Sequence, residues 1–230
     1  MRAHAKLNLY LRVLSRRRDG YHEIVTILHG IDLADDLEVA DGRTGEINLV
    51  ADRDLEPNLV VVAARRLMTR IEGGAGASIR LTKRIPVGAG LGGGSADAAA
   101  TLVALNELWD AGLDRSALME VAAEVGSDVP YFLIGGTALA TGRGEKVRPL
   151  DAPAAMWFVL GLSDDPLMTS AVYDRYDELP LVEGPSPATM IAALGAGDVE
   201  AVGSLLSNDL ERVAIDLRPE LAAKKAVLAG

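Results

Sequence analysis

A glycine-rich stretch followed directly by a helical run is the part of this sequence best suited to chemistry. Five glycines fall between Gly88 and Gly94, and the alanine-rich run 96–105 follows Ser95. Glycine adopts positive φ cheaply and lets another group approach the backbone closely. The first turn of a helix presents free N–H groups at the positive end of the helix dipole, which suits a phosphate. The stretch therefore predicts a phosphate-binding loop rather than a flexible turn, since flexible linkers do not lead straight into a helix.

The loop fits neither of two common phosphate-binding patterns. A Walker A loop ends in Gly-Lys-Ser or Gly-Lys-Thr, whereas Gly94-Ser95 lacks the lysine. Three of the glycines match G-x-G-x-x-G, but the preceding strand, 78–83, alternates and carries charge, and Pro86 separates it from the loop. Charge stabilisation during phosphoryl transfer is therefore left to a metal ion and to residues from elsewhere in the chain.

Asp128 is the best-placed candidate for a catalytic carboxylate. It lies in the short junction 126–130, where a carboxylate beside an acceptor hydroxyl could take the hydroxyl proton if the chain is a kinase. A turn or N-cap aspartate is the competing interpretation. Lys6 and Asn8 share one face of an alternating strand, although a solvated lysine is the more common role for such a residue.

Two neighbouring aromatic residues follow a basic turn near the N-terminus. Tyr21-His22 could stack on a nucleobase and hydrogen-bond its edge, but an exposed aromatic in a loop fits the sequence equally well. His4 and His29 are interpreted as structural. The three histidines lack metal-ligand spacing, so no protein-held metal site is expected.

The composition excludes several classes of protein. The absence of cysteine excludes disulfides and thiolate chemistry, and the net charge of −10 argues against nucleic acid as a partner. Six basic residues nevertheless precede the first acidic residue, Asp19, and this edge could receive an anionic substrate. No apolar run reaches the length of a membrane span, and Lys6 and Arg12 interrupt the N-terminal apolar residues. A cytoplasmic protein without a membrane partner is therefore expected.

Periodicity and turn signals give the elements that must position these residues. Strands are expected at 6–13, 21–33, 37–40, 46–51, 78–83, 137–141, 146–150 and 156–162. Helices are expected at 59–71 with Asn58 as N-cap, from Ser95 as N-cap to about 109, and at 114–126, 187–194, 199–210 and 219–228. Strands and helices that cluster without strict alternation indicate an α+β protein in two lobes, 1–150 and 151–230.

Several motifs together resemble one family. The segments Ala5-Lys6-Leu-Asn8 and Asp19-Gly20-Tyr21-His22 are similar to the start of the 4-diphosphocytidyl-2-C-methyl-D-erythritol kinases, which belong to the GHMP kinase superfamily. The loop 86–95 resembles the ATP motif of the superfamily, and 126–130 and 137–145 also fit the family. The Asp-Gly-Tyr-His segment is the specific part, because mevalonate, homoserine and galactose kinases share the glycine loop.

The resemblance implies a fold and an activity. The fold would be the two-lobed GHMP kinase fold, with an N-terminal lobe like ribosomal protein S5 domain 2 and an incomplete ferredoxin-like C-terminal lobe. The activity would be ATP-dependent phosphorylation of the 2-hydroxyl of 4-diphosphocytidyl-2-C-methyl-D-erythritol, in the non-mevalonate isoprenoid pathway. ATP and Mg²⁺ would be the cofactors, and the partner would be a cytidyl diphosphate sugar alcohol.

The resemblance also implies roles for residues in catalysis and ATP binding. Asp128 would be the base for the substrate hydroxyl, and Lys6 would keep it ionised and stabilise the transferring charge. Asn58 would approach the adenine, with an N-cap as its competing role, and Ser95 would cap its helix, ligate Mg²⁺ or do both. The residues that would wrap the ATP phosphates are Pro86, Val87, Gly88, Ala89, Gly90, Leu91, Gly92, Gly93, Gly94, Ser95 and Ala96.

A second set of residues would bind the acceptor. Asn8 would line the pocket beside the base. Tyr21 and Tyr173 would sandwich the cytosine, His22 would hydrogen-bond its polar edge, and Thr169 would lie nearby.

The sequence departs from the family pattern in two places, of which only the second bears on activity. His4 replaces the usual proline, and the sequence reaches Gly230 without the third superfamily motif, a second glycine-rich segment. From the second departure we expect weak ATP affinity, low turnover and a tendency to aggregate. The alternatives are another GHMP kinase, of the mevalonate or homoserine type, or a nucleotide-binding module without turnover.

Overall fold

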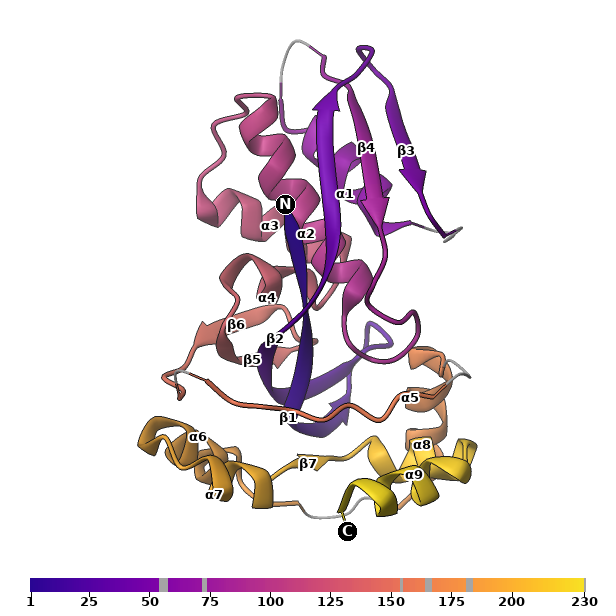
Figure 1. Ribbon diagram of the computed structural model, residues 1–230, viewed down its shortest axis with the longest axis vertical. Coiled ribbons are helices and arrows are strands. Elements are labelled where there is room, and N and C mark those ends of the chain that lie inside the picture. The colour runs from indigo at the N-terminus through magenta and orange to yellow at the C-terminus, as the bar shows by residue number, and fades with distance from the viewer. Residues whose placement is uncertain (54–57, 72–73, 154, 164–166, 181–183, 230) are drawn as a thin grey trace.

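The computed structural model describes residues 1–230 except 54–57, 72–73, 154, 164–166, 181–183 and 230 (Figure 1), so expectations at Gly73 and Gly230 fall outside it. The strands are β1 (Arg2–Arg16), β2 (His22–Asp41), β3 (Ile47–Ala51), β4 (Ala77–Thr82), β5 (Thr137–Gly142), β6 (Lys146–Pro149) and β7 (Ser207–Asn208). The helices are α1 (Leu59–Met68), α2 (Gly93–Leu108), α3 (Arg115–Val125), α4 (Val129–Ile134), α5 (Thr169–Glu178), α6 (Pro187–Ala196), α7 (Val199–Ser204), α8 (Glu211–Leu217) and α9 (Glu220–Ala229). This mixed order confirms the α+β class.

The long strand β2 organises the sheet. It pairs antiparallel with β1, with β5 through Ile24–His29 and with β4 through Asp36–Asp41. The order is β3-β4-β2-β1-β7, and β5 and β6 branch from β2. The predicted hairpin between β1 and β2 is confirmed: Gly20 has φ +87°, and the Arg17 N–H donates to the Tyr21 carbonyl at 2.7 Å.

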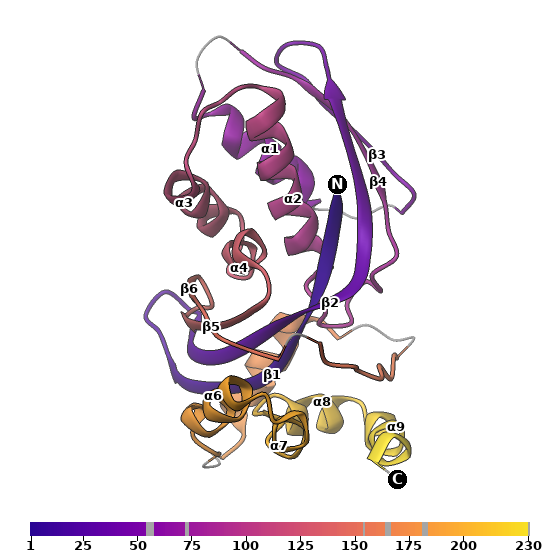
Figure 2. The same cartoon turned by 60° about the vertical axis from the view of Figure 1, so that its left-hand side comes forward.

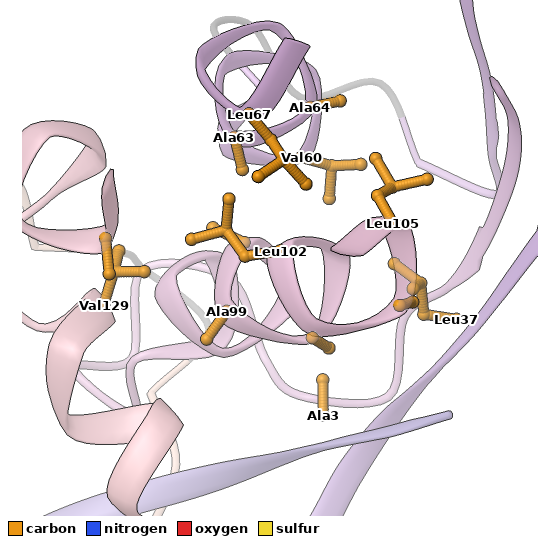
Figure 3. Close-up of a cluster of buried hydrophobic side chains, with 14 of the residues drawn as sticks. Ala3, Leu37, Val60, Ala63, Ala64, Leu67, Ala99, Leu102, Leu105 and Val129 are labelled. Carbon is orange, nitrogen blue, oxygen red and sulfur yellow. The ribbon is translucent and has the colours of Figure 1, made fainter. Parts of the chain in front are cut away.

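Helices α1 to α4 pack on one side of the long strands, with α2 in the middle (Figure 2). Figure 3 shows Leu102 and Leu105 of α2 among Val60 and Leu67 of α1, with Leu37 of β2 nearby. All five side chains are buried. Burial of each large aliphatic side chain contributes about 1.5–3 kcal/mol, so this core holds α2, and the glycine loop that leads into it, against the sheet.

A second core lies on β1 and β2 and includes residues from the C-terminal part of the chain. Leu9 and Tyr10 of β1 pack with Met190 and Leu194 of α6 and with Val202 of α7. Strand β7 also pairs parallel with β1. The C-terminal helices therefore lie at the end of the molecule near the β1–β2 hairpin (Figure 1).

The prediction that Ser95 caps the glycine-rich helix is wrong. The helix begins at Gly93, and its N-cap position is Gly92, which has φ +72° and makes no side-chain cap hydrogen bond. Only glycine adopts this left-handed conformation readily, so the backbone itself turns the chain into the helix. Ser95 therefore lies inside the first turn, where backbone N–H groups have no partner within the helix.

Three further boundaries differ from the expectation because strand pairing decides them. Residues 156–162 are not a strand; they pair with no described strand, and Trp157 and Val159 are 96% and 83% exposed. The expected helix 199–210 ends at Ser204, since 207–208 pair with β1. The expected strands 21–33 and 37–40 form one strand, β2, because residues 34–36 between them pair with β1. No described helix is long and apolar enough to cross a membrane.

Candidate functional site

The glycine loop encloses a cavity of about 270 Å³ at the N-terminus of α2. Gly88, Gly90 and Gly92 have φ near +73°, so the chain turns repeatedly and brings successive backbone groups to one side. The cavity is lined by Asn58, Leu59, Lys83, Ile85, Pro86, Val87, Gly88, Ala89, Gly90, Leu91, Gly92, Gly93, Gly94 and Asp97. Together with the start of a helix, this geometry fits a phosphate chain.

Lys6 connects β1 to the glycine loop through hydrogen bonds from its backbone and its side chain. Its backbone N–H donates to the Leu91 carbonyl at 3.0 Å, and its ammonium group donates to the Gly90 carbonyl at 2.8 Å. The same ammonium donates to Asn8 Oδ1 at 2.6 Å, which confirms that the two side chains share one face of the strand. Lys6 is only 5% exposed, so the solvated role is excluded.

Asp128 lies close to the Lys6 ammonium, with Oδ2 at 3.8 Å from Nζ. It occupies the N-cap position of α4, but its side chain makes no cap hydrogen bond. The role of a capping aspartate is therefore absent here, and the side chain remains 37% exposed. The Lys6 ammonium therefore contacts the glycine loop and also lies near a partly accessible carboxylate.

Asn58 lies at the start of α1 and beside the glycine loop. Its Oδ1 accepts a hydrogen bond from the Val60 N–H at 3.0 Å and so caps α1. The same residue lines the cavity of the glycine loop. The capping role is confirmed, and the role at the adenine stays a prediction.

The residues predicted to hold the cytosine lie near the β1–β2 hairpin and α5. Tyr21 is 51% exposed, with the Arg143 guanidinium 4.7 Å from its ring centroid. His22 is buried and stacks on Tyr173, with ring centroids 4.8 Å apart. Thr169 is the first residue of α5, one turn before Tyr173. The ring beside Tyr173 in this structure is thus that of His22, and the sandwich of Tyr21 and Tyr173 stays a prediction.

The charge of Asp128 is felt at Tyr173 of α5. Burial raises the pKa of the Tyr173 hydroxyl to about 12, with smaller contributions from the charges of Asp128 and Tyr176. The charge of Asp128 acts in the same direction on Tyr131, whose pKa is raised mainly by burial. Asp128 therefore lies within electrostatic reach of α5, although more than forty residues separate them in the sequence.

A buried charge cluster beside the glycine loop was not anticipated from the sequence. Lys83 donates to Asp35 and, at 2.6 Å, to Asp97, and all three residues are buried. Burial raises the pKa of Asp97 to about 7, against the lowering effect of Lys83. Lys83 and Asp97 also line the loop cavity. The sequence does show an aspartate, Asp97, within the otherwise apolar run 96–100. The residues that cluster with it lie in β2 and just after β4, so the sequence alone did not identify them.

His4 and His29 have structural roles in this fold. The His4 ring lies 3.2 Å from the Ile31 carbonyl, and the His29 ring lies 2.6 Å from the Thr137 hydroxyl. Burial lowers the pKa of His29. Among the described residues, no group of three or more histidine, aspartate or glutamate side chains could hold a metal ion.

The fold and the loop define a class of protein. Residues 58–136, which include α1, the glycine loop, α2 and Asp128, match the GHMP kinases N terminal domain. A mevalonate diphosphate decarboxylase from Legionella pneumophila shares the fold at 13% identity, with a TM-score of 0.65 over 92% of this chain and 76% of that one. The protein is thus an ATP-dependent small-molecule kinase of the GHMP class.

Relatives with higher sequence identity indicate a particular kinase family within this class. The chain is 45% identical to a 4-diphosphocytidyl-2-C-methyl-D-erythritol kinase from Bacillus velezensis, over 97% of this chain and 78% of that protein. It is 41% identical to the kinase of the same name from Mycobacterium tuberculosis, over 100% and 74%. A crystal structure of 4-(cytidine 5'-diphospho)-2C-methyl-D-erythritol kinase matches at 34% identity and a TM-score of 0.73, over 97% and 80%. The chain belongs to the 4-diphosphocytidyl-2-C-methyl-D-erythritol kinase family.

Proposed function

We propose that this protein transfers the γ-phosphoryl group of ATP to the 2-hydroxyl of 4-diphosphocytidyl-2-C-methyl-D-erythritol, a step of the non-mevalonate isoprenoid pathway. The observation that carries the proposal is the Lys6 ammonium, which bonds the glycine loop and lies 3.8 Å from Asp128. The names of the relatives support the choice of acceptor. One side chain thus joins a phosphate site to a carboxylate that can act on an acceptor hydroxyl.

In the proposed reaction, the acceptor oxygen forms a bond to the γ-phosphorus while the bond to the bridging oxygen of ADP breaks. The hydroxyl proton passes to the Asp128 carboxylate. The Lys6 ammonium stabilises negative charge on the transferring group, and loop residues 86–96 hold the phosphates through backbone N–H groups. Asn8 keeps Lys6 oriented, since its Oδ1 accepts from the ammonium and its amide donates to the Thr26 hydroxyl at 2.8 Å.

The acceptor is placed by the region between the hairpin and α5. Tyr21 and Tyr173 provide aromatic surfaces for the cytosine, and His22 provides a hydrogen-bonding edge. Thr169 lies one turn before Tyr173 on the same helix. This position lets the acceptor extend from the hairpin toward Asp128.

The residues near the loop fit Mg²⁺ bound together with the nucleotide. Magnesium in kinases is held mostly by phosphate oxygens and water, with one or two protein oxygens, so a site without clustered carboxylates is suitable. The Ser95 hydroxyl, in the first turn of α2, is a protein oxygen that would hold the ion. When bound, the ion would neutralise charge on the phosphates.

The test is phosphoryl transfer from ATP to a panel of acceptors, with the product identified by mass. We expect the cytidyl acceptor to gain one phosphoryl group, and mevalonate and homoserine to gain none. Transfer to mevalonate or homoserine in its place would contradict the proposed acceptor. ATP binding without transfer to any acceptor would contradict the proposed activity.

A further inference from the structure

The ring of His22 is held by residues of α5, and one of them also contacts the opposite strand of the hairpin. Its Nε2 lies 2.7 Å from Asp177 Oδ1, and its ring stacks on Tyr173 with an interplanar angle of 21°. The edge of Tyr176 packs against the same ring, with centroids 6.4 Å apart. Asp177 Oδ2 lies 3.1 Å from Nη1 of Arg16, so both carboxylate oxygens are engaged. The imidazole therefore has a fixed plane and a fixed partner.

This partner determines which nitrogen of His22 carries the proton. An ionised carboxylate only accepts hydrogen bonds, so Nε2 must donate to Asp177. A neutral imidazole has one ring proton, which leaves Nδ1 as an acceptor. None of the described residues hydrogen-bonds to Nδ1. The nitrogen can therefore accept a hydrogen bond from a bound molecule.

We propose that Asp177 is a positioning residue that determines base specificity by fixing the tautomer of His22. With Nδ1 as an acceptor, His22 pairs with the exocyclic amino group of a cytosine and opposes the carbonyl oxygen that uracil has at the same place. The proposal rests on the proposed function, which brings a cytidyl group to this region. A site that hydrogen-bonds one group rejects an analogue that cannot make the bond, because its polar atoms are left unpaired.

Because Asp177 contacts Arg16 as well as His22, asparagine at this position could not keep an oxygen facing both residues. A guanidinium only donates, so in Asp177→Asn the amide oxygen is expected to face Arg16 and the amide NH₂ to face His22. The NH₂ group would then donate to Nε2 and move the ring proton to Nδ1. The exchange alters the hydrogen-bonding edge of His22 while leaving the size of residue 177 almost unchanged.

The experiment measures binding of cytidine diphosphate and uridine diphosphate by calorimetry, with every protein at the same pH. We expect the unmodified protein to prefer cytidine diphosphate by roughly ten- to a hundredfold, the effect of one unpaired polar group, and Asp177→Asn to lose or invert this preference. Asp174→Asn is the matched control, since Asp174 is an exposed aspartate of the same helix. It should keep the preference.

Nitrogen-15 spectra of the histidines give a second readout that needs no ligand. We expect His22 to carry its proton on Nε2 in the unmodified protein and on Nδ1 in Asp177→Asn. An unchanged nucleotide preference in that variant, or a proton on Nδ1 in the unmodified protein, would overturn the inference. Unmodified protein that transfers phosphate to the cytidyl acceptor but binds both nucleotides equally would overturn this inference alone. Protein that neither binds cytidine diphosphate nor transfers phosphate would overturn the proposed function as well.

Discussion

Lys6 illustrates how one buried cation can connect two parts of a reaction site. Its three close contacts, with Gly90, Asn8 and Asp128, come from the glycine loop, its own strand and the start of α4. A buried ammonium needs hydrogen-bond acceptors and a counter-charge, and these three residues provide them. The requirement for burial and the proposed requirement for catalysis are therefore met by the same atoms.

Asp128→Asn removes the proposed base without changing its size. We expect turnover to fall by about 10²–10⁴, because general-base catalysis typically contributes that much. Affinity for the acceptor should change far less, since the interaction matters mainly in the transition state. Steady-state kinetics with the cytidyl acceptor measures both quantities. A variant with near-full turnover would return Asp128 to the role of a turn residue.

The cluster of Lys83, Asp35 and Asp97 is expected to matter for stability. Lys83→Met leaves two buried carboxylates without their cation and should lower the free energy of unfolding by about 3–5 kcal/mol. Asp97→Asn is the matched comparison. It should lose less stability, because Lys83 keeps its ion pair with Asp35 and the amide oxygen at position 97 can still accept a hydrogen bond. Urea unfolding of both variants measures the difference. Equal losses would show that the pairing with Lys83 is not the main contribution of this cluster.

At the scale of the elements, the glycine loop depends on glycine for two separable reasons. Gly90 and Gly92 both have φ near +73°. A Cβ at Gly92 would lie 2.7 Å from the Phe132 ring and 3.1 Å from the Lys6 side chain, whereas one at Gly90 would meet nothing within 4 Å. Both positions require a left-handed backbone, but only Gly92 is also enclosed by side chains.

The two alanine variants separate these reasons. Gly90→Ala should cost about 1–2 kcal/mol of stability, the penalty for a left-handed alanine. Gly92→Ala should cost more and should displace Lys6, because the added methyl group overlaps its neighbours. Thermal unfolding monitored by circular dichroism compares them. If Gly92→Ala is no less stable than Gly90→Ala, the close packing around Gly92 does not constrain the loop.

At the scale of the whole molecule, β1 is shared by the two regions of the chain. We propose residues 1–150 and 151–230 as two lobes that pack through one common core rather than as independent units. Leu9 and Tyr10 of β1 pack with Met190 and Leu194, and the Tyr10 hydroxyl donates to the Pro185 carbonyl at 2.7 Å. The C-terminal helices would expose much of their apolar surface without β1.

This shared core predicts cooperative unfolding of the two regions. Trp109 reports on the first region, where its indole N–H donates to the Gly76 carbonyl, and the buried Met190 reports on the second. In a Trp157→Phe background, Trp109 fluorescence and the Met190 methyl resonance should change at the same urea concentration. Earlier loss of the Met190 signal would mean that the C-terminal region unfolds separately.

Local patterns in the sequence determined most of the elements and the identity of the loop. The alternation in β1 predicted that Lys6 and Asn8 share a face, and the turn at Gly20 predicted the hairpin. These features depend on the backbone preferences of neighbouring residues, which a sequence displays directly. The motifs carried by the same residues also indicated the family.

Contacts between distant segments were decided only by the tertiary structure. The distance from Lys6 to Asp128, the partners of Lys83 and the pairing of His22 with Asp177 join residues 14 to 155 positions apart. Two of the failed expectations have the same cause: 156–162 has an apolar pattern but no described strand beside it, and 207–208 pair with β1. Periodicity specifies which face of an element is apolar, whereas the partner of that face depends on how the whole chain packs.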